Sequence, residues 1–190
     1  MKTSILSGTI ITVFFATGLQ LNAQDKKYPE PDLDGKIYYF DQTENKTVEM
    51  EYGVINETER SAKGGQEQIL EYSKEKSMVR IKKAEKICFL IKMNSEEGAD
   101  LAAAYKLLKL NINPKTKKRD IVVEIRENWS GNIIPKLVKV PFMAKKVVVN
   151  KDKFDNIVLI VGMITVTNLE PGEYVFYYPG TSEGSFFGVD

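Results

Sequence analysis

Residues 168–176 of this chain read Asn-Leu-Glu-Pro-Gly-Glu-Tyr-Val-Phe, and they give the clearest indication of its fold. Pro171 and Gly172 suit the two central positions of a type II turn, because proline fixes φ and glycine accepts a positive φ. Tyr174 and Phe176 follow with one residue between them, so we expect both rings on the same face of a strand. Aromatic side chains directly after a tight turn are typical of a core anchor. The segment therefore predicts two strands joined by a turn, with a buried aromatic face.

Other apolar segments on both sides of this motif are also typical of strands. The run at residues 87–91 predicts a central strand covered on both faces, with Cys88 buried inside it. Residues 157–166 form another apolar run. The apolar ending at residues 186–190 is expected to dock as a strand, because an apolar terminus is poorly tolerated in water. Together these runs favour a strand-rich domain.

A regular alternation of apolar and acidic residues at 47–54 predicts a half-buried strand. We expect its buried face to consist of Val48, Met50, Tyr52 and Val54. The polar residues 56–65, which end in two glycines, are interpreted as a loop. Residues 100–112 fit both helical and strand periodicity, and we predict a helical turn at 99–104 followed by a strand at 105–112.

Only this one segment is a serious helix candidate, which argues against a parallel α/β fold. Many short strands separated by turn signals indicate an antiparallel β-sandwich. We therefore predict an all-β chain folded as an immunoglobulin-like sandwich with at most one short helix. A single domain over residues 36–190 is long enough to bury a core of its own.

The first 23 residues have the pattern of a secretory signal peptide. Lys2 precedes an apolar run from residue 5 to residue 21, and the run ends in Leu-Asn-Ala. We predict cleavage after Ala23 and a periplasmic or extracellular location. The alternative is an N-terminal membrane anchor, since a span needs about 20 apolar residues. Residues 24–35, which contain Pro29 and Pro31, are expected to form a flexible leader.

Residue usage narrows the possible chemistry. The chain has no histidine, which excludes histidine-dependent triads and histidine-ligated zinc. Its one cysteine excludes an internal disulfide. We predict no cofactor, no metal site and no catalytic residue. The catalytic class that remains as an alternative is a carboxylate-based hydrolase acting on glycans or the cell wall.

Charge is segregated along the chain. Residues 24–73 contain 6 basic and 12 acidic residues, residues 74–153 contain 20 and 9, and residues 154–190 contain 0 and 5. The resulting net charges are −6, +11 and −5. The middle segment either presents a basic face to an acidic partner, or it is neutralised by acidic ends that fold back on it.

Four basic residues at the expected hairpin connection, residues 113–119, form a candidate anion-binding site. They are Lys115, Lys117, Lys118 and Arg119. Phosphate or sulfate groups would bind there in a salt-sensitive manner. Nucleic acid is not expected as the partner, because no aromatic stacking platform accompanies these side chains. The alternative is a solvated loop that protects a sheet edge.

Two resemblances add to this interpretation. The Pro-Gly-x-Tyr segment at residues 171–174 is similar to the turn before the last strands of prealbumin-like modules, including carboxypeptidase regulatory-like and Cna-B-like domains. This makes a prealbumin-like sandwich an alternative to the immunoglobulin-like one. A wider pattern resembles small exported proteins of Bacteroidota-type bacteria that have no assigned activity. It comprises residues 77–81, the strand through Phe89, residues 105–107, 118–119 and 171–176, and the ending Phe-Gly-Val-Asp.

These observations favour an exported, non-enzymatic binding or interaction module of the cell envelope. Its expected partner is an envelope protein or an anionic glycan, and no membrane span is expected after cleavage. The hydrolase remains the alternative.

Overall fold

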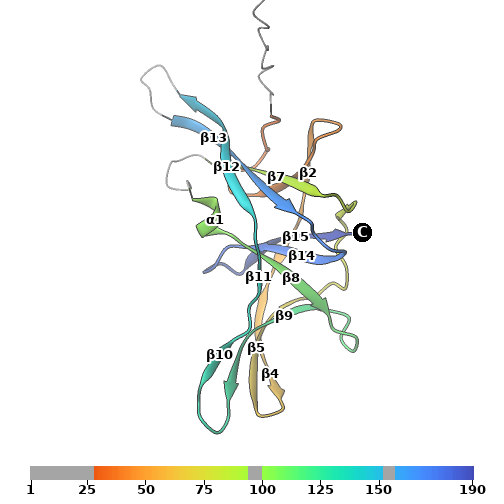
Figure 1. The fold of residues 1–190 in the computed structure, drawn as a ribbon, viewed down its shortest axis with the longest axis vertical. Helices are drawn as coiled ribbons and strands as arrows, with labels where there is room; N and C mark the ends of the chain where they lie inside the picture. The colour runs from red at the N-terminus through yellow and green to blue at the C-terminus, as the bar shows by residue number, and fades with distance from the viewer. Residues whose placement is uncertain (1–27, 94–99, 152–156) are drawn as a thin grey trace, which may run out of the picture.

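The computed structural model describes residues 28–93, 100–151 and 157–190, and the predicted signal peptide lies outside these ranges. The described part is elongated, with sheets stacked along its long axis (Figure 1). Within that part, no helix has the length and apolarity needed to cross a membrane.

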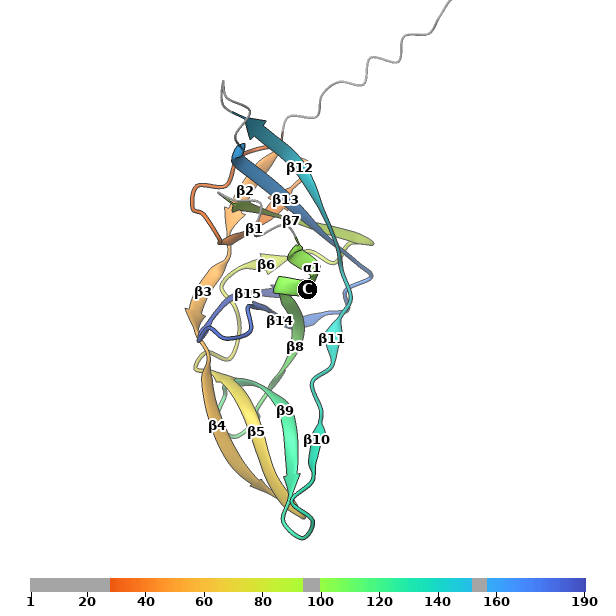
Figure 2. The ribbon, with the colours of Figure 1, turned by 90° about the vertical axis from the view of Figure 1, so that its left-hand side faces the viewer.

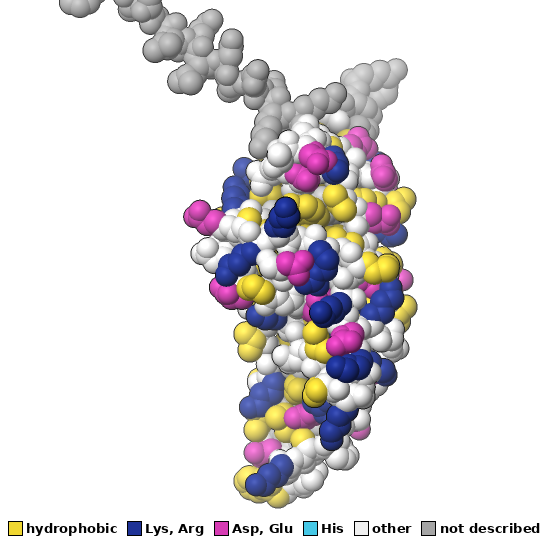
Figure 3. Space-filling view, turned by 90° about the vertical axis from the view of Figure 1, so that its right-hand side faces the viewer, with side chains coloured by type: hydrophobic (Ala, Val, Ile, Leu, Met, Phe, Trp, Pro, Cys, Tyr) yellow, Lys and Arg dark blue, Asp and Glu magenta, His cyan; other side chains and the backbone are white. Residues whose placement is uncertain are grey.

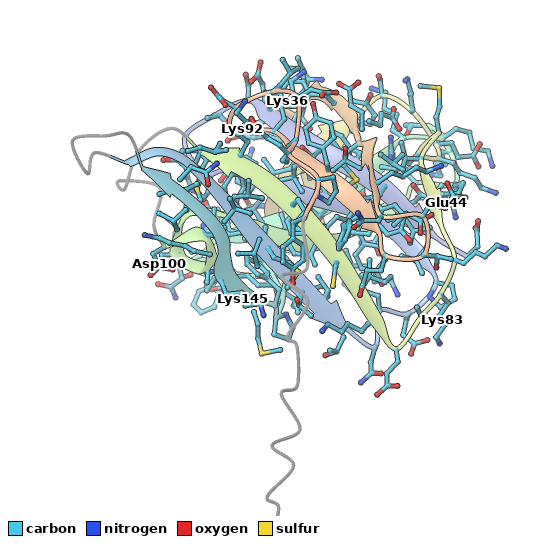
Figure 4. All side chains as sticks on the ribbon, turned by 90° about the horizontal axis from the view of Figure 1, so that it is seen from above. Lys36, Glu44, Lys83, Lys92, Asp100 and Lys145 are labelled. Atoms are coloured by element: carbon cyan, nitrogen blue, oxygen red, sulfur yellow. The ribbon has the colours of Figure 1, made fainter. Side chains whose placement is uncertain are left out.

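Two sheets form the body, and we call them the upper sheet and the curled sheet. The upper sheet contains, in spatial order, β12 (Met143–Lys151), β13 (Ile157–Thr167), β7 (Lys86–Met93), β1 (Ile37–Asp41) and β2 (Lys46–Glu49). Figure 4 shows it from above, with the labelled charged side chains around its rim. As predicted, β7 is central, lying between β13 and β1.

The curled sheet is larger and bends strongly. Its main path runs through β3 (Glu51–Val54), β15 (Glu183–Val189), β14 (Gly172–Tyr177), β8 (Lys106–Ile112), β9 (Arg119–Glu127), β5 (Gly65–Tyr72) and β4 (Asn56–Ala62). Three short strands join it: β6 (Arg80–Ile81) pairs with β15, β11 (Lys139–Val140) with β8, and β10 (Ile133–Pro135) with β9. The described residues contain one short helix, α1 (Leu101–Ala104). The prediction of an all-β sandwich with at most one short helix is confirmed.

The main core lies between the two sheets. Phe89 of β7 is fully buried there, and its ring contacts Phe176 of β14 and Phe187 of β15 at centroid distances of 4.9 and 5.0 Å. Tyr174 stacks on Phe187 at 5.4 Å. These aromatic rings therefore join the last two strands to the centre of the upper sheet.

A second core forms because the curled sheet folds back over its own outer face. It contains Val175 and Phe186 from one half of that sheet, and Leu70, Tyr72 and Ile121 from the other half. Tyr72 stacks on Phe186 with a centroid distance of 4.0 Å. Each of β14 and β15 is thus covered on both faces.

Several other predictions about individual segments are confirmed. Tyr174 and Phe176 are buried in the main core, whereas Val175 lies in the second core, as the alternation indicated. The C-terminal segment docks as β15, between β3 and β14. Residues 100–112 form a helical turn followed by a strand. Cys88 is a free, buried thiol.

The predicted type II turn at Pro171 and Gly172 is wrong. Gly172 already belongs to β14, and its φ of +154° is far from the value near +80° that such a turn requires at its second central position. A left-handed φ of 54° occurs earlier, at Asn168. The Tyr174 hydroxyl donates a hydrogen bond to the carbonyl of Glu170 at 2.6 Å, which closes the bend instead.

The prediction for residues 47–54 is also wrong. The segment divides at Met50 into β2 and β3, which belong to different sheets. Beyond Met50 the alternation reverses: Glu51 is buried, while Tyr52 and Val54 are exposed. The reason is that the chain crosses between the sheets at this point, and Glu51 has an internal ionic partner.

The predicted loop at residues 56–65 is instead a hairpin. β4 pairs with β5 in continuous register, from Asn56 opposite Glu71 to Ala62 opposite Gly65. Gly64 supplies the positive φ of 89° that the tight turn needs. Because most of β4 is exposed, its sequence lacks the apolar positions by which a strand is usually found.

Residues 28–35, expected to belong to a flexible leader, make specific contacts with the upper sheet. The Tyr28 ring lies edge-on to Phe40 at 5.8 Å, and the backbone N–H of Gly35 donates to the carbonyl of Lys92 at 2.8 Å. Glu30 forms a salt bridge with Lys92 at 2.7 Å. The described part of the leader therefore contacts the upper sheet through Tyr28, Glu30 and Gly35.

Replacing Phe187 with alanine should strongly destabilise the fold. The side chain is fully buried and lies in the aromatic cluster that joins the sheets. We expect the free energy of unfolding, measured by chemical denaturation, to fall by about 3–5 kcal/mol. Val138→Ala is the control, because Val138 is 75 % exposed and its truncation should cost less than about 0.5 kcal/mol. Similar losses in both variants would contradict the assigned core.

Candidate functional site

Ion pairs link the three charge segments of the chain. Residues of the acidic N-terminal segment pair with the basic middle, as in Glu71–Lys118 at 2.6 Å. The acidic C-terminal segment does the same, as in Glu170–Lys83 at 3.0 Å. On the face shown in Figure 3, basic and acidic side chains are interspersed. Among the described residues, seven of the 20 basic residues of the middle segment are therefore paired with carboxylates within the molecule.

The most buried of these contacts involves Arg119 at the start of β9. Its side chain has no exposed surface and lies beside the stacked rings of Tyr72 and Phe186, with Cζ 4.6 and 4.9 Å from their centroids. The guanidinium contacts Glu51 of β3 at 3.5 Å and Glu173 of β14 at 3.2 Å. Arg119 also donates from Nε to the carbonyl of Lys74 at 3.0 Å. We call these groups the Arg119 network.

Glu51 is held in its ionised form within this network. Burial opposes ionisation, but hydrogen bonds from Lys74, Ser77 and Tyr72 outweigh it and lower the pKa of Glu51 to about 2. The Tyr72 hydroxyl donates at 2.9 Å, and the Lys74 ammonium lies 2.9 Å from the carboxylate. The buried carboxylate is thus fully engaged, as buried charges require.

Glu173 extends the network to the C-terminus. It accepts the backbone N–H of Ser77 at 2.8 Å and pairs with Arg80, which also pairs with Asp190. The Arg80 guanidinium lies directly against Gly188, where an added Cβ would be 1.7 Å from Nη1. These contacts fix several segments around one buried cluster, and we assign the cluster a structural role.

Three of the four predicted anion-binding residues form ion pairs within the molecule. Arg119 is buried in the network, Lys118 pairs with Glu71, and Lys117 pairs with Glu75 at 3.5 Å. Lys115 is exposed at the connection. Three of the four positive charges therefore have carboxylate partners, which leaves this connection a poor site for an external anion.

Unpaired lysines occur instead along residues 133–150, which we call the lysine strap. The strap runs through β10, β11 and β12, which follow one another along one edge of the body (Figure 2). Its lysines are all exposed, namely Lys136, Lys139, Lys145 and Lys146. Among the described residues, none of them forms a salt bridge.

The sequence explains this lack of partners. No Asp or Glu occurs between Glu127 and Asp152. Asp100 and Lys145 both lie near α1 in Figure 4, but the Asp100 carboxylate caps that helix by accepting the Ala103 N–H at 3.0 Å. The strap also exposes five large apolar side chains of the twelve so exposed in the described residues: Ile133, Ile134, Val138, Met143 and Val149.

A hollow of about 280 Å³ lies where the strap passes α1, and we call it the strap hollow. Lys106 of β8 and Lys139 of β11 line it, together with Tyr105, Val140 and Phe142. Like Lys139, Lys106 forms no salt bridge to a described residue. Two lysines, Lys106 and Lys139, therefore line one small cavity at the middle of the strap.

A second hollow, of about 260 Å³, adjoins the first through Tyr105, and we call it the tyrosine hollow. Tyr52, Tyr105, Tyr178 and Glu183 line it, along with small and hydroxyl-bearing residues. The Tyr105 and Tyr178 rings meet edge-on at 5.5 Å. The Tyr52 hydroxyl donates a hydrogen bond to Glu183, and this bond together with burial raises the pKa of Tyr52 to about 12.

A third hollow, of about 430 Å³, shares Thr181 with the tyrosine hollow. Its lining includes Glu57, Tyr177 and Ser182. Glu57 and Glu183 thus line different hollows, and each of the two hollows is lined by one carboxylate. A carboxylate-based glycoside hydrolase would need an acid and a base flanking the same bond.

No family model matches the chain, and comparisons with curated proteins and with solved structures return no match. The functional proposal therefore rests on the residues and their geometry. One sequence signal for the lysine strap is available in retrospect, namely the acid-free interval between Glu127 and Asp152. The tyrosine hollow has no such signal, because its residues come from separate segments of the chain.

Replacing Arg119 with methionine should destabilise the protein far more than its place in a basic run suggests. The substitution leaves Glu51 and Glu173 buried without their shared cation. We expect the free energy of unfolding to fall by about 3–5 kcal/mol. The neighbouring Lys118→Met is the control, since its partly exposed pair with Glu71 should be worth less than about 1 kcal/mol. Equal losses in the free energy of unfolding of the two variants would contradict the special role of Arg119.

The pKa of Glu51 predicts how stability depends on pH. Because folding lowers this pKa from 4.5 to about 2, the ionised carboxylate stabilises the fold above pH 4.5, and this contribution is lost as the pH falls towards 2. Its full size is about 3 kcal/mol. In denaturation series from pH 7 to pH 3, Glu51→Gln should lose less stability on acidification than the wild type. Glu59→Gln, on exposed β4, should follow the wild type. Parallel curves for all three proteins would contradict the assignment.

Proposed function

We propose that this protein is an exported, non-enzymatic binding module of the cell envelope, and that its lysine strap binds an anionic glycan. The predicted signal peptide supports export. The observation that carries the proposal is that four exposed lysines without a carboxylate partner in the described structure lie on one continuous segment, residues 133–150, that contains no Asp or Glu.

The length of the strap favours a polymer over a single small anion. Lys136 and Lys146 are ten residues apart, and an extended chain would separate them by up to about 33 Å. Lys139 and the strap hollow lie between them. Because the field of an exposed charge extends about 8 Å at physiological salt, the four lysines act on successive parts of an elongated ligand.

The side chains between the lysines favour a carbohydrate polymer. The strap offers exposed aliphatic groups, such as Val138 and Met143, that can contact the CH surfaces of sugar rings. Its one aromatic residue, Phe142, is half-buried and packs against Phe176 at 6.0 Å, so the strap has no stacking platform for nucleic-acid bases. Lysine is depleted in protein–protein interfaces, which disfavours a protein partner.

Neutralising the strap should abolish this binding. A variant with Lys136, Lys139, Lys145 and Lys146 replaced by glutamine keeps the side-chain length and removes four charges. In affinity electrophoresis we expect the wild type to be retarded in gels containing alginate, a carboxylated polysaccharide, and not in gels containing neutral dextran. The variant should bind alginate at least about tenfold more weakly, and added salt should weaken the wild type more than the variant.

The matched control replaces four lysines that are exposed and unpaired in the described structure but lie outside the strap. They are Lys63, Lys82, Lys86 and Lys115. This variant should bind alginate like the wild type. Equal losses in both variants would mean that net charge, not the strap, attracts the polymer. Binding to vesicles of anionic phospholipid in the absence of binding to alginate would overturn the glycan assignment.

A further inference from the structure

The tyrosine hollow differs chemically from the lysine strap beside it. Its lining combines four aromatic residues, three tyrosines and Phe176, with Glu183 and the hydroxyl-bearing residues Thr181 and Ser185. No Lys or Arg lines either this hollow or the third hollow that shares Thr181. Glu183 is the one charged residue in the lining of the tyrosine hollow and would repel an anionic group, so the site suits an uncharged ligand.

We infer that the tyrosine hollow is a binding site for an uncharged sugar ring. Tyr52 and Tyr178 are 43 % and 45 % exposed, and their rings offer apolar surface for the CH groups of a pyranose. Glu183 supplies acceptor oxygens for sugar hydroxyls, and the hydroxyls of Thr181 and Ser185 act as donors or acceptors. A small hollow with convergent polar groups on an apolar lining has the general character of a ligand site.

The hollow is held in shape by contacts among its own residues. The Tyr105 hydroxyl donates to the carbonyl of Gly35 at 3.1 Å, and its ring supports Tyr178 edge-on. The Lys36 ammonium lies 4.7 Å from the centroid of Tyr52, whose hydroxyl is bound to Glu183. Rings fixed in this way lose little freedom when a ligand binds, which favours affinity.

Two other hollows each share a lining residue with the tyrosine hollow. Thr181 connects it to the third hollow, and Tyr105 connects it to the strap hollow with Lys106 and Lys139. A saccharide chain can therefore extend from the neutral site towards the lysine strap. This inference goes beyond the proposed function, because none of its residues belongs to the strap.

The test is binding of neutral tetrasaccharides to the full chain by saturation-transfer NMR and calorimetry. The probes are cellotetraose, maltotetraose and chitotetraose, the last in its N-acetylated form. We expect at least one of them to bind the wild type. Tyr178→Ala should weaken that binding about five- to tenfold through loss of the ring, whereas Tyr178→Phe should retain it.

Trp129→Ala provides the matched control, because Trp129 is an aromatic side chain that is 82 % exposed and lies outside the hollow. It should bind the tetrasaccharide like the wild type, and so should the fourfold glutamine variant of the strap, which separates this inference from the proposed function. The inference is overturned if no tetrasaccharide binds, or if Tyr178→Ala and Trp129→Ala have the same effect. It is also overturned if tetramethylammonium, a cation suited to aromatic cages, binds there in place of the sugars.

Discussion

The buried guanidinium of Arg119 is the constraint on which the rest of the structure depends. It connects β3, β9 and β14 by contacting Glu51 and Glu173, and it packs against two stacked rings, one from each half of the curled sheet. Removing these charges from water costs several kcal/mol per ion, and only complete pairing offsets that cost. The network therefore requires the acidic segments at both ends of the chain to fold onto the basic middle.

The pairing of charges within the molecule also determines which basic side chains remain available to bind an anionic partner. Glu71 and Glu75 neutralise the adjacent lysines Lys118 and Lys117, and Glu170 neutralises Lys83. The strap has no acidic residue of its own and no described carboxylate in contact with its lysines, so its charge remains available at the surface. The strap lysines are thus distinguished by sharing one acid-free segment in which none of them is paired to a described carboxylate.

The sequence predicted the parts of the fold that depend on local hydrophobicity. The central strand at residues 87–91, the aromatic pair Tyr174 and Phe176, and the docked terminus all follow from apolar runs or alternation. β4 was missed because its exposed residues carry no apolar pattern. The turn at Pro171 was misassigned because residue preference alone does not fix φ at Gly172.

The candidate site was less predictable, because it depends on contacts between distant residues. Arg119 follows two lysines that pair with surface glutamates, and nothing in that run indicates that one of its cations is buried. Glu51 lies in an alternating segment that indicates exposure, yet it faces Arg119 after the chain changes sheets at Met50. The tyrosine hollow combines Tyr52, Tyr105 and Tyr178, which only the tertiary fold brings together.

The most direct measurement is amide chemical-shift mapping of the full chain during titration with short alginate oligomers. If internal pairing leaves the strap as the exposed anion-binding surface, the largest shift changes will occur at residues 133–150 and at Lys106. Changes concentrated at residues 115–118, where the lysines are dense but two of them are paired, would contradict that account. Shifts spread evenly over all exposed lysines would contradict it as well.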